Sequence, residues 1–97
     1  MAVLYTGLKA LNTTQASEVK QIAEEYCDKI TTRFPGHTVR LVLKEMDKKV
    51  DKAKYLFSAH VEGPGKSLKG HGEDFDLHKS VHQAFNGIKI QIEKKKG

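Results

Sequence analysis

Residues 13–34, TTQASEVKQIAEEYCDKITTRF, decide how this chain folds, because their apolar side chains recur at the spacing of one helical face. The opposite side of the same stretch is mostly charged or polar. Asn12-Thr13-Thr14 offers side-chain oxygens that can cap a first turn, and Pro35-Gly36 ends the helix. The stretch therefore predicts an amphipathic helix whose apolar face consists of Val19, Ile22, Ala23, Tyr26, Ile30 and Phe34.

Segments on both sides of this helix have the composition of strands. Residues 3–8 are rich in strand-forming residues and lie next to a glycine, so they predict a short first strand. Residues 38–45 and 55–62 alternate apolar and polar side chains, and residues 66–72 should return as a weaker strand. Short connections between these three strands predict an antiparallel meander. The apolar sides of its first two strands are Val39, Leu41, Leu43, Tyr55, Phe57, Ala59 and Val61.

A second helix is predicted after Asp74 and Asp76, because two carboxylates suit the positive end of a helix dipole. The Asn86-Gly87 step leaves an alternative, in which residues 88–92 form a strand, since a glycine inside a helix costs about 1 kcal/mol. The helix is favoured because it accounts for more apolar positions, and it leaves Ile90 in solvent. Its apolar stripe is Leu77, Val81, Ala84, Phe85, Ile88 and Ile92.

The predicted order is strand, helix, three strands, helix, which is an α+β fold (β-α-β-β-β-α) with a four-stranded sheet. Each helix carries one apolar stripe, so both should pack on the same face of that sheet. Ninety-seven residues fit a single domain over residues 1–97, with 93–97 as a frayed basic tail. There is no apolar run of membrane-spanning length, no signal-peptide pattern and one cysteine, so we expect a cytoplasmic protein.

The formal net charge of +5 is unevenly distributed. The first predicted helix is nearly neutral, whereas residues 37–54 and 77–97 are basic. Excess positive charge attracts polyanions, and each phosphate contact releases condensed counterions. The charge therefore favours a nucleic-acid partner, and the alternative is a solvated surface that lysines keep soluble.

Several short motifs occur in a characteristic order along this chain. In that order and spacing the sequence resembles the short ribosome hibernation factors, also called sigma-54 modulation or ribosomal subunit interface proteins. The resemblance covers the chain from Val3 to Lys96. The motifs are Thr6-Gly7 at the end of the first strand, Glu24-Glu25 in the first helix, Lys29-Ile30 and Arg33-Phe34 near its end, Val61 before a glycine turn, and Glu73-Asp74-Phe75-Asp76-Leu77 at the second helix.

The resemblance implies a fold similar to double-stranded-RNA-binding domains and a role as a ribosome-associated translation regulator. Such a protein binds small-subunit rRNA in the channel used by mRNA and tRNA, and silences translation under stress or in stationary phase. It is not an enzyme, and we expect no cofactor, no small-molecule substrate and no membrane partner. The chain looks like the short form, so we expect a monomer away from the ribosome.

Basic residues near the ends of both helices and in the tail are predicted to contact RNA. Structured RNA offers phosphates and 2′-hydroxyls more readily than base edges, so recognition would be by shape. The family usually has a lysine and an arginine late in the second helix, where this chain has Gly87 and Ile90, and a lysine where it has Tyr26. The predicted RNA-binding residues are Lys29, Arg33, Lys89, Lys94, Lys95 and Lys96.

Two other functions stay open, a generic structured-RNA-binding module and a protein-interaction domain that uses the open side of the sheet. Arg40 and Lys44 share one side of a strand and could form a secondary patch there.

The histidines and the single cysteine are the candidates for metal ligands and for a nucleophile. His78 and His82 lie one helical turn apart, and His60 and His71 could face each other across a hairpin. Neither pair has an evident third ligand, so no metal site is predicted. Cys27 lies near the edge of the first helix's apolar stripe and is interpreted as a core residue, not as a nucleophile.

Overall fold

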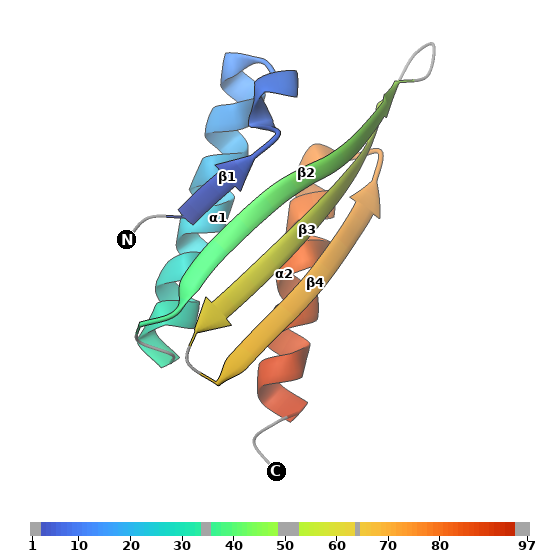
Figure 1. Ribbon diagram of the computed structural model, residues 1–97. Helices are drawn as coiled ribbons and strands as arrows, with labels where there is room; N and C mark the ends of the chain where they lie inside the picture. The colour runs from blue at the N-terminus through green and yellow to red at the C-terminus, as the bar shows by residue number, and fades with distance from the viewer. Residues whose placement is uncertain (1–2, 34–35, 49–52, 64, 95–97) are drawn as a thin grey trace.

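The structure is a computed structural model and describes residues 3–33, 36–48, 53–63 and 65–94. It contains one four-stranded sheet and two helices, which lie together behind the sheet in Figure 1. Neither helix, within the described ranges, is long and apolar enough to cross a membrane. The elements are β1 (Val3–Thr6), the 3-10 helix η1 (Leu8–Ala10), α1 (Thr13–Arg33), β2 (Thr38–Lys48), β3 (Ala53–Gly63), β4 (Lys66–Asp74) and α2 (Leu77–Lys94).

The strands lie in the order β1-β2-β3-β4. β1 is parallel to β2, while β2, β3 and β4 form the predicted antiparallel meander. A parallel pair needs a crossover connection, and α1 provides it. The register between β3 and β4 pairs His60 with Lys69 and Ser58 with His71. His60 and His71 are therefore diagonal neighbours on adjacent strands and do not form a register pair.

Both helices bury their apolar stripes against the same face of the sheet, as predicted (Figure 1). Cys27 is 1% exposed and belongs to this core. The predicted α+β fold, with its β-α-β-β-β-α order, is confirmed. The core includes Val19, Ala23 and Ile30 of α1, Val39, Leu41 and Leu43 of β2, Tyr55, Phe57, Ala59 and Val61 of β3, and Leu77, Val81, Ala84, Phe85, Ile88 and Ile92 of α2.

Several strand ends differ from the sequence prediction: β3 begins two residues earlier, at Ala53, β4 ends two residues later, at Asp74, and the ends of β1 and β2 differ for identifiable reasons. β1 stops at Thr6 because Gly7 has a left-handed backbone (φ 83°), and a Cβ there would lie 2.7 Å from the carbonyl oxygen of Leu43. β2 continues to Lys48 through a register shift between Leu43 and Glu45. A bulge of this kind adds one residue to a strand and resets its alternation, which a strictly alternating pattern does not anticipate.

Helix α2 is continuous through residues 88–92, so the strand alternative is excluded and the favoured helix is confirmed. Its backbone rests directly on that of β4. Side chains at Gly70 and Gly72 would overlap the carbonyl oxygens of Ala84 and Ser80. A Cβ at Gly87 would lie 3.2 Å from the Cα of Gly70. Gly87, whose helix propensity is poor, therefore lies where the backbones of helix and strand approach closely.

The N-terminus of α1 is closed by a reciprocal pair of hydrogen bonds. The Gln15 amide donates to Oδ1 of Asn12 at 2.8 Å, and the Asn12 amide donates to Oε1 of Gln15 at 3.3 Å. This is a capping box, and it confirms the capping role predicted for this turn.

We expect Asn12→Ala to lower the free energy of unfolding by about 1 kcal/mol, because the Gln15 amide loses the side-chain oxygen that accepts its hydrogen bond. Thermal unfolding followed by circular dichroism should show a melting temperature about 4–8 °C lower. Thr14→Ala is the control, since Thr14 is exposed in the same turn and should change little. Equal melting temperatures for the two variants would contradict a stabilising cap.

Candidate nucleic-acid interface

The two helices run in the same direction, so their C-terminal ends lie at the same end of the molecule (Figure 1). They meet through the rings of Tyr26 and Phe85, which stack with centroids 4.9 Å apart and planes 6° apart. Beyond this contact the helix pair leaves a hollow of about 270 Å³, here called the interhelix cleft. The cleft is lined by Tyr26, Lys29, Ile30, Arg33, Phe85, Lys89 and Ile92.

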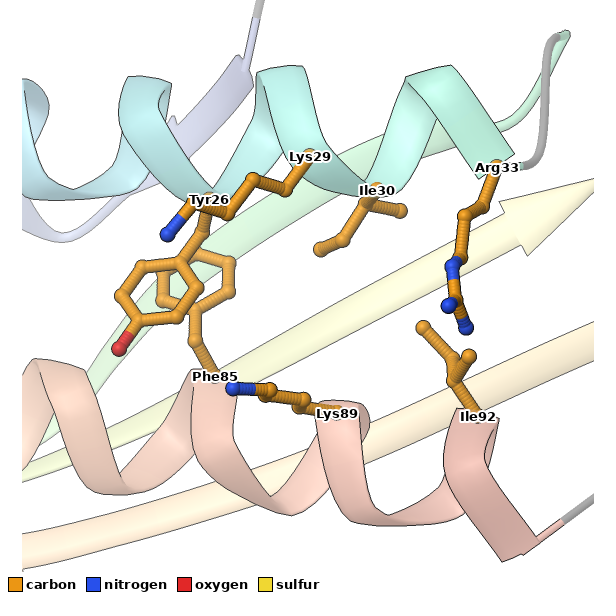
Figure 2. Close-up of a pocket in the computed structure, with 7 residues that line it drawn as sticks. All are labelled: Tyr26, Lys29, Ile30, Arg33, Phe85, Lys89 and Ile92. Carbon is orange, nitrogen blue, oxygen red and sulfur yellow. The ribbon is translucent and has the colours of Figure 1, made fainter.

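Three of the predicted RNA-binding residues line this cleft together. Lys29 and Arg33 are four residues apart on α1, which places them on one helical side. Lys89 comes from the facing side of α2. The side chain of Arg33, on α1, extends toward Ile92 of α2 (Figure 2). The structure therefore brings basic groups from both helices to one place. That they bind RNA stays a prediction at this point.

Apolar side chains separate the basic groups of the interhelix cleft. Ile30 and Ile92 are buried below it, and the stacked pair of Tyr26 and Phe85 closes one end. The alkyl stem of a lysine can lie along such a surface while its ammonium group stays in water. A charge next to low-dielectric walls is screened less than one in open solvent, so an anion here would be bound more strongly.

Tyr26 was expected in the apolar face of the first helix, at a position where a lysine is common in the family that the sequence resembles. Its ring lies 5.8 Å from Nζ of Lys29, within the range of a cation–π interaction. Its hydroxyl is 2.8 Å from Nδ1 of His82. Burial, and after it the carboxylate of Glu25, raises the pKa of Tyr26, so the phenol stays protonated at neutral pH. The ring is thus a fixed neutral platform beside a lysine.

The described residues form ion pairs on the sheet and between the two helices. Within the described ranges, salt bridges join Arg40 to Glu62 and Lys54 to Glu73, and His78 contacts Glu18 across the helix pair. None ties a basic residue of the cleft to the carboxylate of another described residue.

Two histidines in the N-terminal half of α2 contact α1. His78 contacts Glu18 of α1 and His82 contacts Tyr26, so both histidines join the two helices. In the described part of the chain, there is no group of three His, Cys, Asp or Glu side chains that could hold a metal ion.

The remaining predicted site residues lie at the C-terminus. Lys94 is the last residue of α2, so part of the segment 93–97 that was expected to fray is helical. α2 ends at the same end of the molecule as α1 (Figure 1), and its residue Ile92, two positions before Lys94, lines the interhelix cleft. Lys95 and Lys96 lie outside the described residues.

Solved structures share this arrangement of helices and strands. A ribosomal subunit interface protein from Coxiella burnetii matches with a TM-score of 0.69 and 18% sequence identity, over 99% of this chain and 98% of that one. This chain has the fold of a ribosomal subunit interface protein. The N-terminal domain of Protein Y from Thermus thermophilus matches with a TM-score of 0.64 and 19% identity, over 97% of this chain and 98% of that one.

These likenesses confirm the fold that the sequence resemblance implied. No protein-family model and no curated protein sequence matches the chain. The similarity to double-stranded-RNA-binding domains is looser, and extends to a sheet with helices on one face.

Proposed function

We propose that this protein associates with the ribosome, binds small-subunit rRNA in the channel used by mRNA and tRNA, and silences translation under stress or in stationary phase. The proposal rests above all on one observation, that two parallel helices bring Lys29, Arg33 and Lys89 to a single cleft. It is supported by the fold, which is shared over almost the whole chain with a ribosomal subunit interface protein.

The cleft suits a folded RNA backbone. Lysine ammonium groups act as rotatable point charges, and the guanidinium of Arg33 can hold a phosphate with two hydrogen bonds. Contacts of this kind position a protein on RNA without reading bases, so specificity would come from the shape of the rRNA groove. The net charge of +5 would also raise the rate of encounter with the ribosome.

This function needs binding and no chemical step. A domain held in the channel excludes mRNA and tRNA because they would occupy the same space. It requires no cofactor and no small-molecule substrate, and it operates in the cytoplasm, where ribosomes are. Away from the ribosome we propose that the protein is a monomer.

Sedimentation of native lysate through a sucrose gradient tests the proposal directly. We expect the protein to travel with small subunits or whole ribosomes at physiological salt. Protein that remains at the top of the gradient would contradict ribosome association. Raising the salt from about 50 to 200 mM should weaken the association by a factor of ten or more, because each phosphate contact releases counterions.

Competition separates a ribosome-specific protein from a generic RNA binder. Purified small subunits should displace the protein from a random RNA duplex at a much lower mass concentration than free copies of the same duplex do. Equal competition would favour the generic structured-RNA-binding function. An association whose affinity hardly changes with salt concentration would instead favour a protein interface.

A further inference from the structure

The open face of the sheet carries a second group of basic side chains, separate from the interhelix cleft. Both helices cover the other face (Figure 1), so this side has no covering element among the described residues. The group, here called the open-face cluster, comprises Arg40, Lys44, His60, Lys69 and His71.

Strand register explains why these residues gather. Arg40 of β2 pairs with His60 of β3, and His60 pairs with Lys69 of β4. All three lie in one row across the sheet, and neighbouring strands are about 4.8 Å apart. Arg40 and Lys69 therefore flank His60 within about 10 Å. β1 extends the row with Leu4, whose side chain is 47% exposed.

The next row adds polar and aromatic character to the same surface. Ser58 pairs with His71, and the Ser58 hydroxyl is 2.8 Å from Nδ1 of that histidine. His71 is exposed, so its ring lies at the surface beside the first row. Unpaired bases stack on aromatic rings, histidine included, and a four-stranded sheet with such rings can serve as a platform for single-stranded RNA.

We propose that the open-face cluster binds a segment of single-stranded RNA, with its phosphates on Arg40 and Lys69 and its bases against the two histidines. Charge complementarity selects this occupant. The groups acting on His60 are three cations, Arg40, Lys44 and Lys69, against one carboxylate, Glu62. Glu62 lies 4.0 Å from Arg40 with both side chains about half exposed, which is a weak surface pair that a phosphate can replace.

A protonation effect should accompany this binding. Partial burial, followed by the ammonium of Lys69, lowers the pKa of His60, with Lys44 and Arg40 acting in the same direction and Glu62 opposing them. His60 is therefore neutral at neutral pH. A phosphate nearby favours the protonated ring and raises that pKa, so RNA binding takes up a proton and tightens as the pH falls.

Fluorescence anisotropy with a labelled oligouridylate tests the proposal on the full chain. Arg40→Gln combined with Lys69→Gln should weaken binding by roughly fiftyfold at 50 mM salt and reduce the slope of log K against log salt by about 1.4, since each single-strand phosphate contact contributes about 0.7. Lys9→Gln with Lys79→Gln is the matched control, because it removes equal charge from exposed positions elsewhere and should bind like the wild type. Arg40→Lys with Lys69→Arg should also keep wild-type affinity.

Two further measurements complete the test. Wild-type affinity should rise between about pH 8 and pH 6, and His60→Gln should reduce this rise because glutamine gains no proton. Labelled polyglutamate should bind much more weakly than oligouridylate. Unchanged RNA affinity in the Arg40 and Lys69 variant, or equal affinity for polyglutamate, would overturn the inference.

The outcome is independent of the proposed function. Ribosome association is tested by sedimentation of variants in the interhelix cleft, whereas the open-face cluster is tested with free RNA. A protein that binds oligouridylate through Arg40 and Lys69 but never sediments with ribosomes would disprove the first proposal and support the second.

Discussion

Lys29→Glu combined with Lys89→Glu is expected to abolish co-sedimentation with ribosomes at physiological salt. The variant replaces one basic group on each wall of the interhelix cleft by a carboxylate. Loss of two phosphate contacts, each worth roughly a factor of ten at 0.1 M salt, predicts an affinity at least about a hundredfold lower. Repulsion between the new carboxylates and RNA would add to this loss. Titration of labelled protein with purified small subunits measures the effect.

The matched control for this variant is Lys9→Glu with Lys79→Glu. Both of these lysines are exposed, in η1 and in the first turn of α2, away from the cleft-forming ends of the helices. The two variants change the net charge equally, so a general electrostatic effect would weaken both alike. Full ribosome binding by the Lys29 and Lys89 variant, with an unchanged melting temperature, would disprove the role of the cleft.

Gly72→Ala is expected to cause a large loss of stability. A Cβ at this position meets the carbonyl oxygen of Ser80, the amide nitrogen of Ala84 at 2.8 Å and Cβ of Gln83 at 2.9 Å. Two of these atoms belong to the helix backbone, which can yield only if α2 moves away from β4. We expect the free energy of unfolding to fall by about 3 kcal/mol, the upper range for overpacking of a core. The melting temperature would fall by about 12 °C or more.

Ser67→Ala is the control for this prediction. Ser67 is exposed on the same strand, so its substitution tests alanine in β4 without contact to the helix. Urea denaturation gives the free energies of both variants. Similar values for the two would show that α2 can shift at little cost, and that the close helix–strand contact contributes little to stability.

Periodicity predicted the elements of this fold because helices and strands each bury one side of a regular pattern. The stripe from Leu77 to Ile92 outweighed the unfavourable Gly87, and the structure confirms that helix. Strand register was harder to predict. Gly63 pairs with Lys66, so the length of one turn determines that His60 faces Lys69. A pattern of apolar residues contains little information about turn length, so the sequence left open whether His60 pairs with His71.

The candidate site was predictable in part for the same reason. Lys29 and Arg33 share a helical side, and a parallel arrangement of the helices brings Lys89 to them. The contribution of Tyr26 depends on tertiary contacts with Phe85 and His82, which a single sequence does not reveal. An aromatic residue in an apolar stripe is the one available signal, and that signal is shared by ordinary core residues.

The two helices are fastened to the sheet in different ways. α2 touches β4 backbone to backbone at Gly70 and Gly72, so it has almost no freedom to roll or slide. α1 packs on the sheet through side chains such as Val19, Ala23 and Ile30, and a contact between side chains leaves more room for a small helix shift than a contact between backbones. We therefore expect the α2 wall of the cleft to stay in place and the α1 wall to be the one that moves. Any widening that lets a bulkier RNA strand enter would be a displacement of α1.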